Sequence, residues 1–169
     1  GRLAEQKKAA FFVPISVMKE TVQVPLKIKR FELNAFRIKT AIENKWLQVI
    51  NTKNDTLKIL EELNYYAKDL CFAENKPLQL VHEGEMEALA LRKTMDADAL
   101  VIDERTTRML LEEPFNLLKL YEFRTGKKLH FDKEKLFNFQ KTAGNTTIFR
   151  SSEIIALGYE KNCFEKELE

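Results

Sequence analysis

The chain is poor in the residues that build covalent or metal-based scaffolds. Its 169 residues include only two cysteines, Cys71 and Cys163, and neither lies in a CxxC or CxxH pattern. Two thiols so far apart predict neither a zinc site nor a secreted disulfide framework. The two histidines, His82 and His130, have no partner at ligand spacing. We therefore expect neither histidine to bind a metal or to act as a general base.

Long apolar runs and a strong net charge are also missing. No apolar stretch approaches the length that crosses a bilayer, and no signal peptide is visible. This pattern predicts a cytoplasmic protein that does not associate with a membrane. The net charge is only +2, so any nucleic-acid-binding surface has to be local. The five glycines and four prolines mark no linker.

What remains is the composition of an ordinary globular protein, with 44% hydrophobic and 32% charged residues. A chain of this length can bury a substantial core, which predicts a single domain over residues 1–169. Apolar runs alternate with helical patterns, including a long helix from Asn54 whose apolar stripe extends to Leu70 and takes in Cys71 as core. This alternation indicates an α/β fold with a mostly parallel sheet. The expected strands are 11–14, 46–50, 99–103, 128–131 and 146–149.

The segment "DALVIDERTTR", residues 98–108, carries the clearest chemical signal. Its continuous apolar run predicts a strand buried on both faces, and Asp103 and Glu104 follow that strand directly. Glu20 lies on the helix after the first visible strand, and Glu85 opens a later helix with Glu87 two residues on. The carboxyl ends of parallel strands and the helices after them share one sheet edge, so these acids can converge. Mg²⁺ and Mn²⁺ prefer such oxygen ligands.

Each acid also has a simpler explanation. Glu85 and Glu87 in the first turn of a helix complement the helix dipole without any catalytic role. Asp103 is equally suited to cap the next helix. Glu20 alone is typical of a solvated surface position.

Three segments in this order resemble the successive motifs of the PIN-domain nucleases: "FFVPISVMKE", "EGEMEALAL" and "DADALVIDERTTR". The resemblance covers roughly the first 110 residues. It implies a three-layer α/β/α sandwich with a mostly parallel central sheet. It also implies metal ligands at Glu20, Glu85 and Asp103, with Glu104 in support. Glu87 replaces Glu85 if the register of the GEMEA segment differs by one helical step.

The beginning of the chain departs from the family pattern. PIN domains begin with a strand that ends in an aspartate, whereas this sequence opens at "GRLAEQ". The resemblance therefore implies either a native upstream segment that supplies this aspartate or a protein that is not fully catalytic.

Basic residues supply candidate contacts to a nucleic-acid backbone. The run "KIKRFELNAFRIK" contains Lys27, Lys29, Arg30, Arg37 and Lys39 against one acid, and such a patch can bind phosphates. Arg105 and Arg108 follow the acidic pair and can pair with phosphate. A solvated face of an amphipathic helix explains either group equally well.

Together these features predict a Mg²⁺- or Mn²⁺-dependent nuclease, more specifically an endoribonuclease that hydrolyses RNA phosphodiesters, with single-stranded DNA as a second substrate class. The alternative is a catalytically inactive PIN-like module that binds RNA or a protein. A toxin–antitoxin ribonuclease would add an antitoxin-like protein partner, and a homodimer is also compatible with the sequence.

Overall fold

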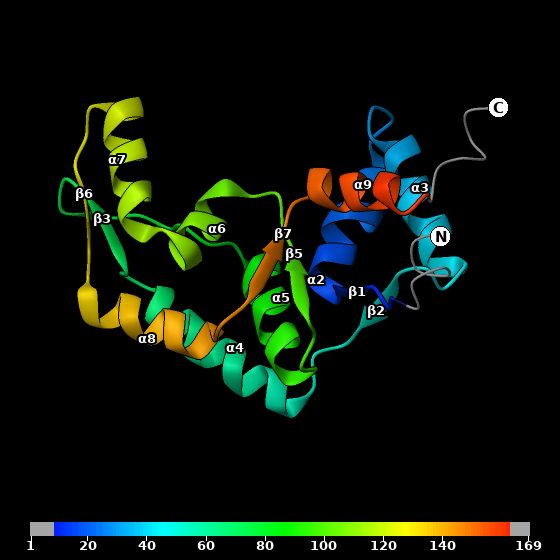
Figure 1. Ribbon diagram of the computed structural model, residues 1–169, viewed down its shortest axis with the longest axis horizontal. Coiled ribbons are helices and arrows are strands. Elements are labelled where there is room, and N and C mark those ends of the chain that lie inside the picture. The colour runs from blue at the N-terminus through cyan, green and yellow to red at the C-terminus, as the bar shows by residue number, and fades with distance from the viewer. Residues whose placement is uncertain (1–8, 163–169) are drawn as a thin grey trace. The chain divides into compact units, whose positions relative to one another are not determined.

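The computed structural model describes residues 9–162 (Figure 1). The opening "GRLAEQ" segment, on which the expected upstream strand depends, and Cys163 lie outside the described residues. The chain divides into two compact units, which we call unit 1 and unit 2. In the described part, unit 1 comprises residues 9–52 and 151–162, and unit 2 comprises residues 53–150.

Unit 1 contains two short strands and a set of helices. Its elements are β1 (Phe12–Pro14), α2 (Ile15–Met18), the π-helix η1 (Lys19–Gln23), the 3-10 helix η2 (Pro25–Lys27), α3 (Glu32–Glu43), β2 (Gln48–Ile50) and α9 (Ser151–Glu160). The strands β1 and β2 are parallel, with Val13 opposite Val49.

Pro14 ends β1 and precedes the first helical residue. A proline has no N–H to donate, and its φ suits the entry to a helix. The helix then widens into η1, where the N–H of Val24 donates to the carbonyl of Lys19 at 3.0 Å. Glu20 lies on this π-turn and is exposed.

Unit 2 contains most of the buried residues. Its elements are α4 (Asn54–Ala67), β3 (Cys71–Ala73), β4 (Lys76–Pro77), α5 (Glu83–Thr94), β5 (Ala99–Val101), α6 (Arg105–Glu112), α7 (Pro114–Thr125), β6 (Leu129–Phe131), α8 (Lys133–Ala143) and β7 (Thr147–Phe149). Helix α4 packs against both α5 and α8. Leu63, Leu89 and Phe139 from these helices are each 0% exposed, and they mark the centre of one continuous core.

Two small sheets border this core. β5 and β7 are parallel, with Leu100 opposite Ile148, and they lie side by side in Figure 1. β3 pairs antiparallel with both β4 and β6. Glu74 and Asn75 join β3 to β4, and both have positive φ, 50° and 66°. Such a two-residue connection with φ positive at both positions gives the twist that antiparallel strands need.

The strand β3 corrects one expectation from the sequence. Cys71 was expected to continue the apolar stripe of the α4 helix, but the helix ends at Ala67 and Cys71 begins a strand. The expected burial of Cys71 is confirmed at 0% exposure. That burial removes water from the thiol and raises its pKa from 9.0 to about 11, against the lowering effect of a hydrogen bond from the backbone of Phe72.

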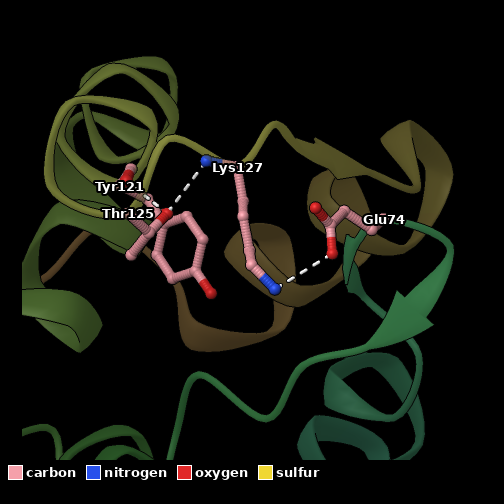
Figure 2. Close-up of polar contacts among 4 residues, drawn as sticks. All are labelled: Glu74, Tyr121, Thr125 and Lys127. Carbon is pink, nitrogen blue, oxygen red and sulfur yellow. Dashed lines mark hydrogen bonds and ion pairs between the residues drawn. The ribbon is translucent and has the colours of Figure 1, made fainter.

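An exposed ion pair fastens the β3–β4 turn to the segment that follows α7. Lys127 Nζ donates to Glu74 Oε2 at 3.0 Å, while the Lys127 N–H donates to Thr125 Oγ1 at 3.2 Å, as Figure 2 shows. The hydrogen bond to Glu74 is the main cause of the raised pKa of Lys127. Gly126, with φ of 70°, ends α7 just before this contact in the left-handed conformation that favours glycine.

The predicted α/β class is confirmed by these elements. The three-layer arrangement around one central sheet stays a prediction, and so does the single domain over residues 1–169. None of the helices in the described part of the chain is long and apolar enough to cross a membrane.

Candidate functional site

The candidate site in unit 2 begins with the strand β5. As predicted, an apolar strand precedes the acidic pair, and Leu100 is buried. Val101, however, is 47% exposed, so the expectation of burial on both faces is wrong. The reason is that among the described residues β5 pairs only with β7, and its side chains alternate between the core and the surface.

Glu104 is the residue that caps α6. The backbone N–H of Thr107 donates to Glu104 Oε2 at 2.6 Å, and this bond satisfies one of the first helical N–H groups. The capping role that the sequence left open for Asp103 thus belongs to its neighbour. Asp103 lies one residue before the cap and is exposed.

Glu85 has a comparable position at the start of α5. Its Oε2 accepts from the backbone N–H of His82, the residue that precedes the helix, at 2.9 Å. The carboxylate therefore lies at the positive end of the helix dipole, where a negative charge is stabilised. His82 contributes its backbone here.

Thr107 brings these two carboxylates together. Its hydroxyl donates to Glu85 Oε2 at 2.7 Å, while its backbone N–H donates to Glu104. Thr107 is 0% exposed, so both contacts are made at the edge of the core. Within the described residues, the second carboxylate oxygens of Glu85 and Glu104, Oε1 in each, have no hydrogen bond from the protein.

Thr107 was not identified from the sequence as a site residue, although its spacing from Glu104 could have indicated it. A threonine three residues after a capping acid places its N–H opposite that acid. The second contact, from its hydroxyl to Glu85, joins residues 22 positions apart. That contact depends on the tertiary fold, which brings Thr107 of α6 to Glu85 at the start of α5, and no local pattern reveals it.

The remaining predicted residues are placed as follows. Glu87 lies on α5, one half-turn beyond Glu85, and is 4% exposed. Arg105 opens α6 and is exposed. Arg108 lies next to Thr107 on the same helix, and its Nε is a buried donor without a hydrogen-bond partner in the described part of the chain. Such an unpaired donor is costly unless a further acceptor reaches it.

Glu20 belongs to unit 1, whereas Glu85, Asp103 and Glu104 belong to unit 2. The predicted meeting of Glu20 with the other acids therefore stays a prediction. Lys27, Lys29 and Arg30 also lie in unit 1, in and just after η2, and all three are exposed.

A magnesium or manganese site can be tested against these donors. No group of three or more His, Cys, Asp or Glu side chains within residues 9–162 is arranged to hold a metal ion. Mg²⁺, however, is commonly held by only one or two carboxylates, with water and substrate phosphate completing its shell. Glu85 and Glu104 together supply the number of carboxylates that this simpler mode of binding uses.

No protein-family model matches the chain, and neither a curated protein nor a solved structure does.

Proposed function

We propose that the protein is a Mg²⁺- or Mn²⁺-dependent nuclease that hydrolyses RNA phosphodiesters and has a PIN-like three-layer fold. The observation that supports this proposal best is the convergence of Glu85 and Glu104 on Thr107. Two helix starts from separate parts of the chain present carboxylates to one buried residue. Asp103 lies beside them in sequence and is exposed.

Glu85 and Glu104 would hold the cation through the oxygens that Thr107 leaves free, and Asp103 would join them. Within unit 2, Glu87 is the further ligand that the sequence pattern suggests. A divalent ion bound here would lower the pKa of a coordinated water and offset negative charge on the phosphate.

The chain's own residues have two tasks in this reaction. Thr107 fixes both carboxylates, so that little reorganisation is needed when substrate arrives. The exposed Arg105 and the half-buried Arg108 would position the phosphate. No side-chain nucleophile is required, because water attacks the phosphorus.

The test compares Glu85→Gln with Glu83→Gln in a chain that includes any native upstream residues. Both substitutions remove one charge from the first turn of α5, and the glutamine oxygen at position 85 can still accept from His82 and Thr107. We expect Glu85→Gln to lower cleavage of single-stranded RNA about 100-fold, as loss of a metal-site group does. Glu83→Gln should cleave like the wild type.

Cleavage is measured with Mn²⁺ or Mg²⁺ and with a chelator, and a thermal melt confirms that each variant is folded. Asp103→Asn, which keeps side-chain size, should behave like Glu85→Gln. Wild-type cleavage that continues in chelator would contradict the proposal. Full activity of both Glu85→Gln and Asp103→Asn would also contradict it.

A catalytically inactive module is the second candidate, and one observation favours it. Glu85 and Glu104 both act as caps of their helices, which gives each a sufficient structural reason. If the wild type binds RNA or a protein partner but cleaves nothing with either metal, this reading replaces the first.

A further inference from the structure

The segment between η2 and the first half of α3 exposes aromatic and basic side chains together. Phe31 and Phe36 are 45% and 56% exposed, and Leu33 is 64% exposed. Lys27, Lys29, Arg30 and Arg37 are exposed within the same eleven residues. A face that only contacts water does not need three large apolar side chains at its surface. We call these seven residues the α3 surface.

Local structure holds this surface in place. The N–H groups of Phe31 and Glu32 both donate to the carbonyl of Ile28, at 2.8 and 3.1 Å, which turns the chain directly into α3. Helix α3 also packs against η1 and η2. Leu33, Phe36 and Arg37 are three and four residues apart, so they share one helix face.

One contact already pairs a cation with a ring on this surface. The guanidinium carbon of Arg30 lies 5.6 Å from the centre of the Phe31 ring, within the range of a cation–π interaction. Such an Arg–Phe pair presents a flat face next to a positive charge.

This combination matches the chemistry of an unpaired nucleic-acid strand. Bases expose flat π-faces that stack on aromatic side chains, and the phosphates that connect them need cations. A duplex offers the phosphates but keeps its base faces stacked inside. An apolar protein partner would use the phenylalanines but not four cations against the single acid, Glu32.

We propose that the α3 surface binds single-stranded nucleic acid, with bases stacked on Phe31 and Phe36 and phosphates contacted by Lys27, Lys29, Arg30 and Arg37. This binding is independent of the carboxylate site, so it persists even if the proposed nuclease activity fails.

The experiment measures fluorescence anisotropy of a labelled single-stranded RNA oligonucleotide of about 12 nucleotides, a length within the site sizes of such proteins. Chelator is present throughout, so metal-dependent cleavage plays no part in the result. We expect Phe36→Ala to weaken binding about 5- to 100-fold, the range for loss of one stacked base. Phe123→Ala is the matched control, because Phe123 is 89% exposed on α7 in unit 2, and it should bind like the wild type.

Two replacements separate stacking from simple apolar contact. Phe36→Tyr keeps a ring and should bind within a few-fold of the wild type, whereas Phe36→Leu keeps apolar area and should remain as weak as Phe36→Ala. Lys29→Gln should lower the dependence of log affinity on log salt by about 0.7, the value for one lost phosphate contact on a single strand. Circular dichroism confirms the fold of each variant.

Three outcomes would overturn the proposal. The first is wild-type protein that does not bind the strand at low salt, or binds the annealed duplex equally well. The second is Phe36→Leu that binds as tightly as the wild type. The third is that light scattering shows a wild-type dimer, that Phe36→Ala is a monomer, and that its RNA affinity is unchanged. The α3 surface would then be an interface between two copies of the protein.

Discussion

The two units differ in how they treat their apolar side chains. In unit 2, large side chains such as Leu63, Leu89 and Phe139 are 0% exposed and form one core. In the described part of unit 1, three apolar residues are buried, and none of them is large: Val13, Val22 and Ala35. Buried apolar area is the main favourable term in folding, so among residues 9–162 those of unit 2 supply most of this stabilising term.

The polar groups differ in the same way. Thr107 in unit 2 is buried and its hydroxyl joins two helices. Thr40 in unit 1 is also on a helix, but its hydroxyl donates to the carbonyl of Phe36 one turn earlier, at 3.0 Å in an exposed position. Glu85 in unit 2 thus receives a hydrogen bond from a distant part of the chain, whereas the hydroxyl of Thr40 bonds only within its own helix.

The largest expected effect tests the difference between the cores. Leu89→Ala should lower the free energy of unfolding by about 2–5 kcal/mol, because it leaves a cavity in a packed interior. Leu33→Ala makes the same change at a residue that is 64% exposed, and its effect should stay within about 0.5 kcal/mol.

Urea unfolding followed by circular dichroism measures both variants. The single tryptophan, Trp46, lies in unit 1, so its fluorescence reports that unit separately. Equal loss of stability in Leu89→Ala and Leu33→Ala would break the comparison.

The next effect concerns the two threonines. Thr107→Val keeps side-chain shape and the N–H donated to Glu104, but it removes the hydroxyl donated to Glu85. A hydrogen bond to a charged group contributes about 1.5–3 kcal/mol, and we expect a loss of that size in urea unfolding. Thr40→Val should change stability by less than about 0.5 kcal/mol. A Thr107→Val protein as stable as the wild type would show that Thr107 does not fix the carboxylates.

The smallest expected effect is a pH dependence of stability that arises because the Cys71 thiol is buried in the core of unit 2. The pKa of Cys71 is raised from 9.0 to about 11, so between these values the folded thiol keeps a proton that the unfolded thiol loses. The resulting stability is fully present below pH 9 and is lost as pH rises toward 11. Its size is on the order of 2 kcal/mol.

Other groups titrate in this range, so the measurement is the difference between wild type and Cys71→Ala, both with Cys163→Ser. The wild type should lose more stability than Cys71→Ala on going from pH 9 to pH 11. The folded thiol should also react slowly with a thiol reagent at about pH 8, where it is protonated. Parallel pH curves for the two proteins would contradict a dry environment at Cys71.

Local signals in the sequence were sufficient for much of the fold. Pro14 at the entry of a helix and the apolar run before Asp103 both predicted their elements correctly. The hairpin at Glu74 and Asn75 was missed, because its turn has no glycine although both residues have positive φ. The strand at Cys71 was read as helix, since a short apolar run has no period of its own.

For the candidate site, the sequence indicated the acids but not how they are held. Glu85 and Glu104 could be selected because each begins a helix. Their link through Thr107 required a contact between residues 22 positions apart, which is a property of the tertiary structure. Glu20 shows the limit of what the sequence can predict. Its position on a helical turn after β1 follows from nearby residues, but its distance from the other acids depends on the tertiary structure.

The order of the two units along the chain has a consequence for synthesis. Unit 2 is one continuous segment, whereas unit 1 is built from segments on both sides of it. A ribosome releases the chain from the N-terminus, and domains generally fold as units as they emerge. All of unit 2 is therefore translated before α9, the last described element of unit 1, exists. Until then unit 1 is incomplete, so it is the later of the two units to finish folding.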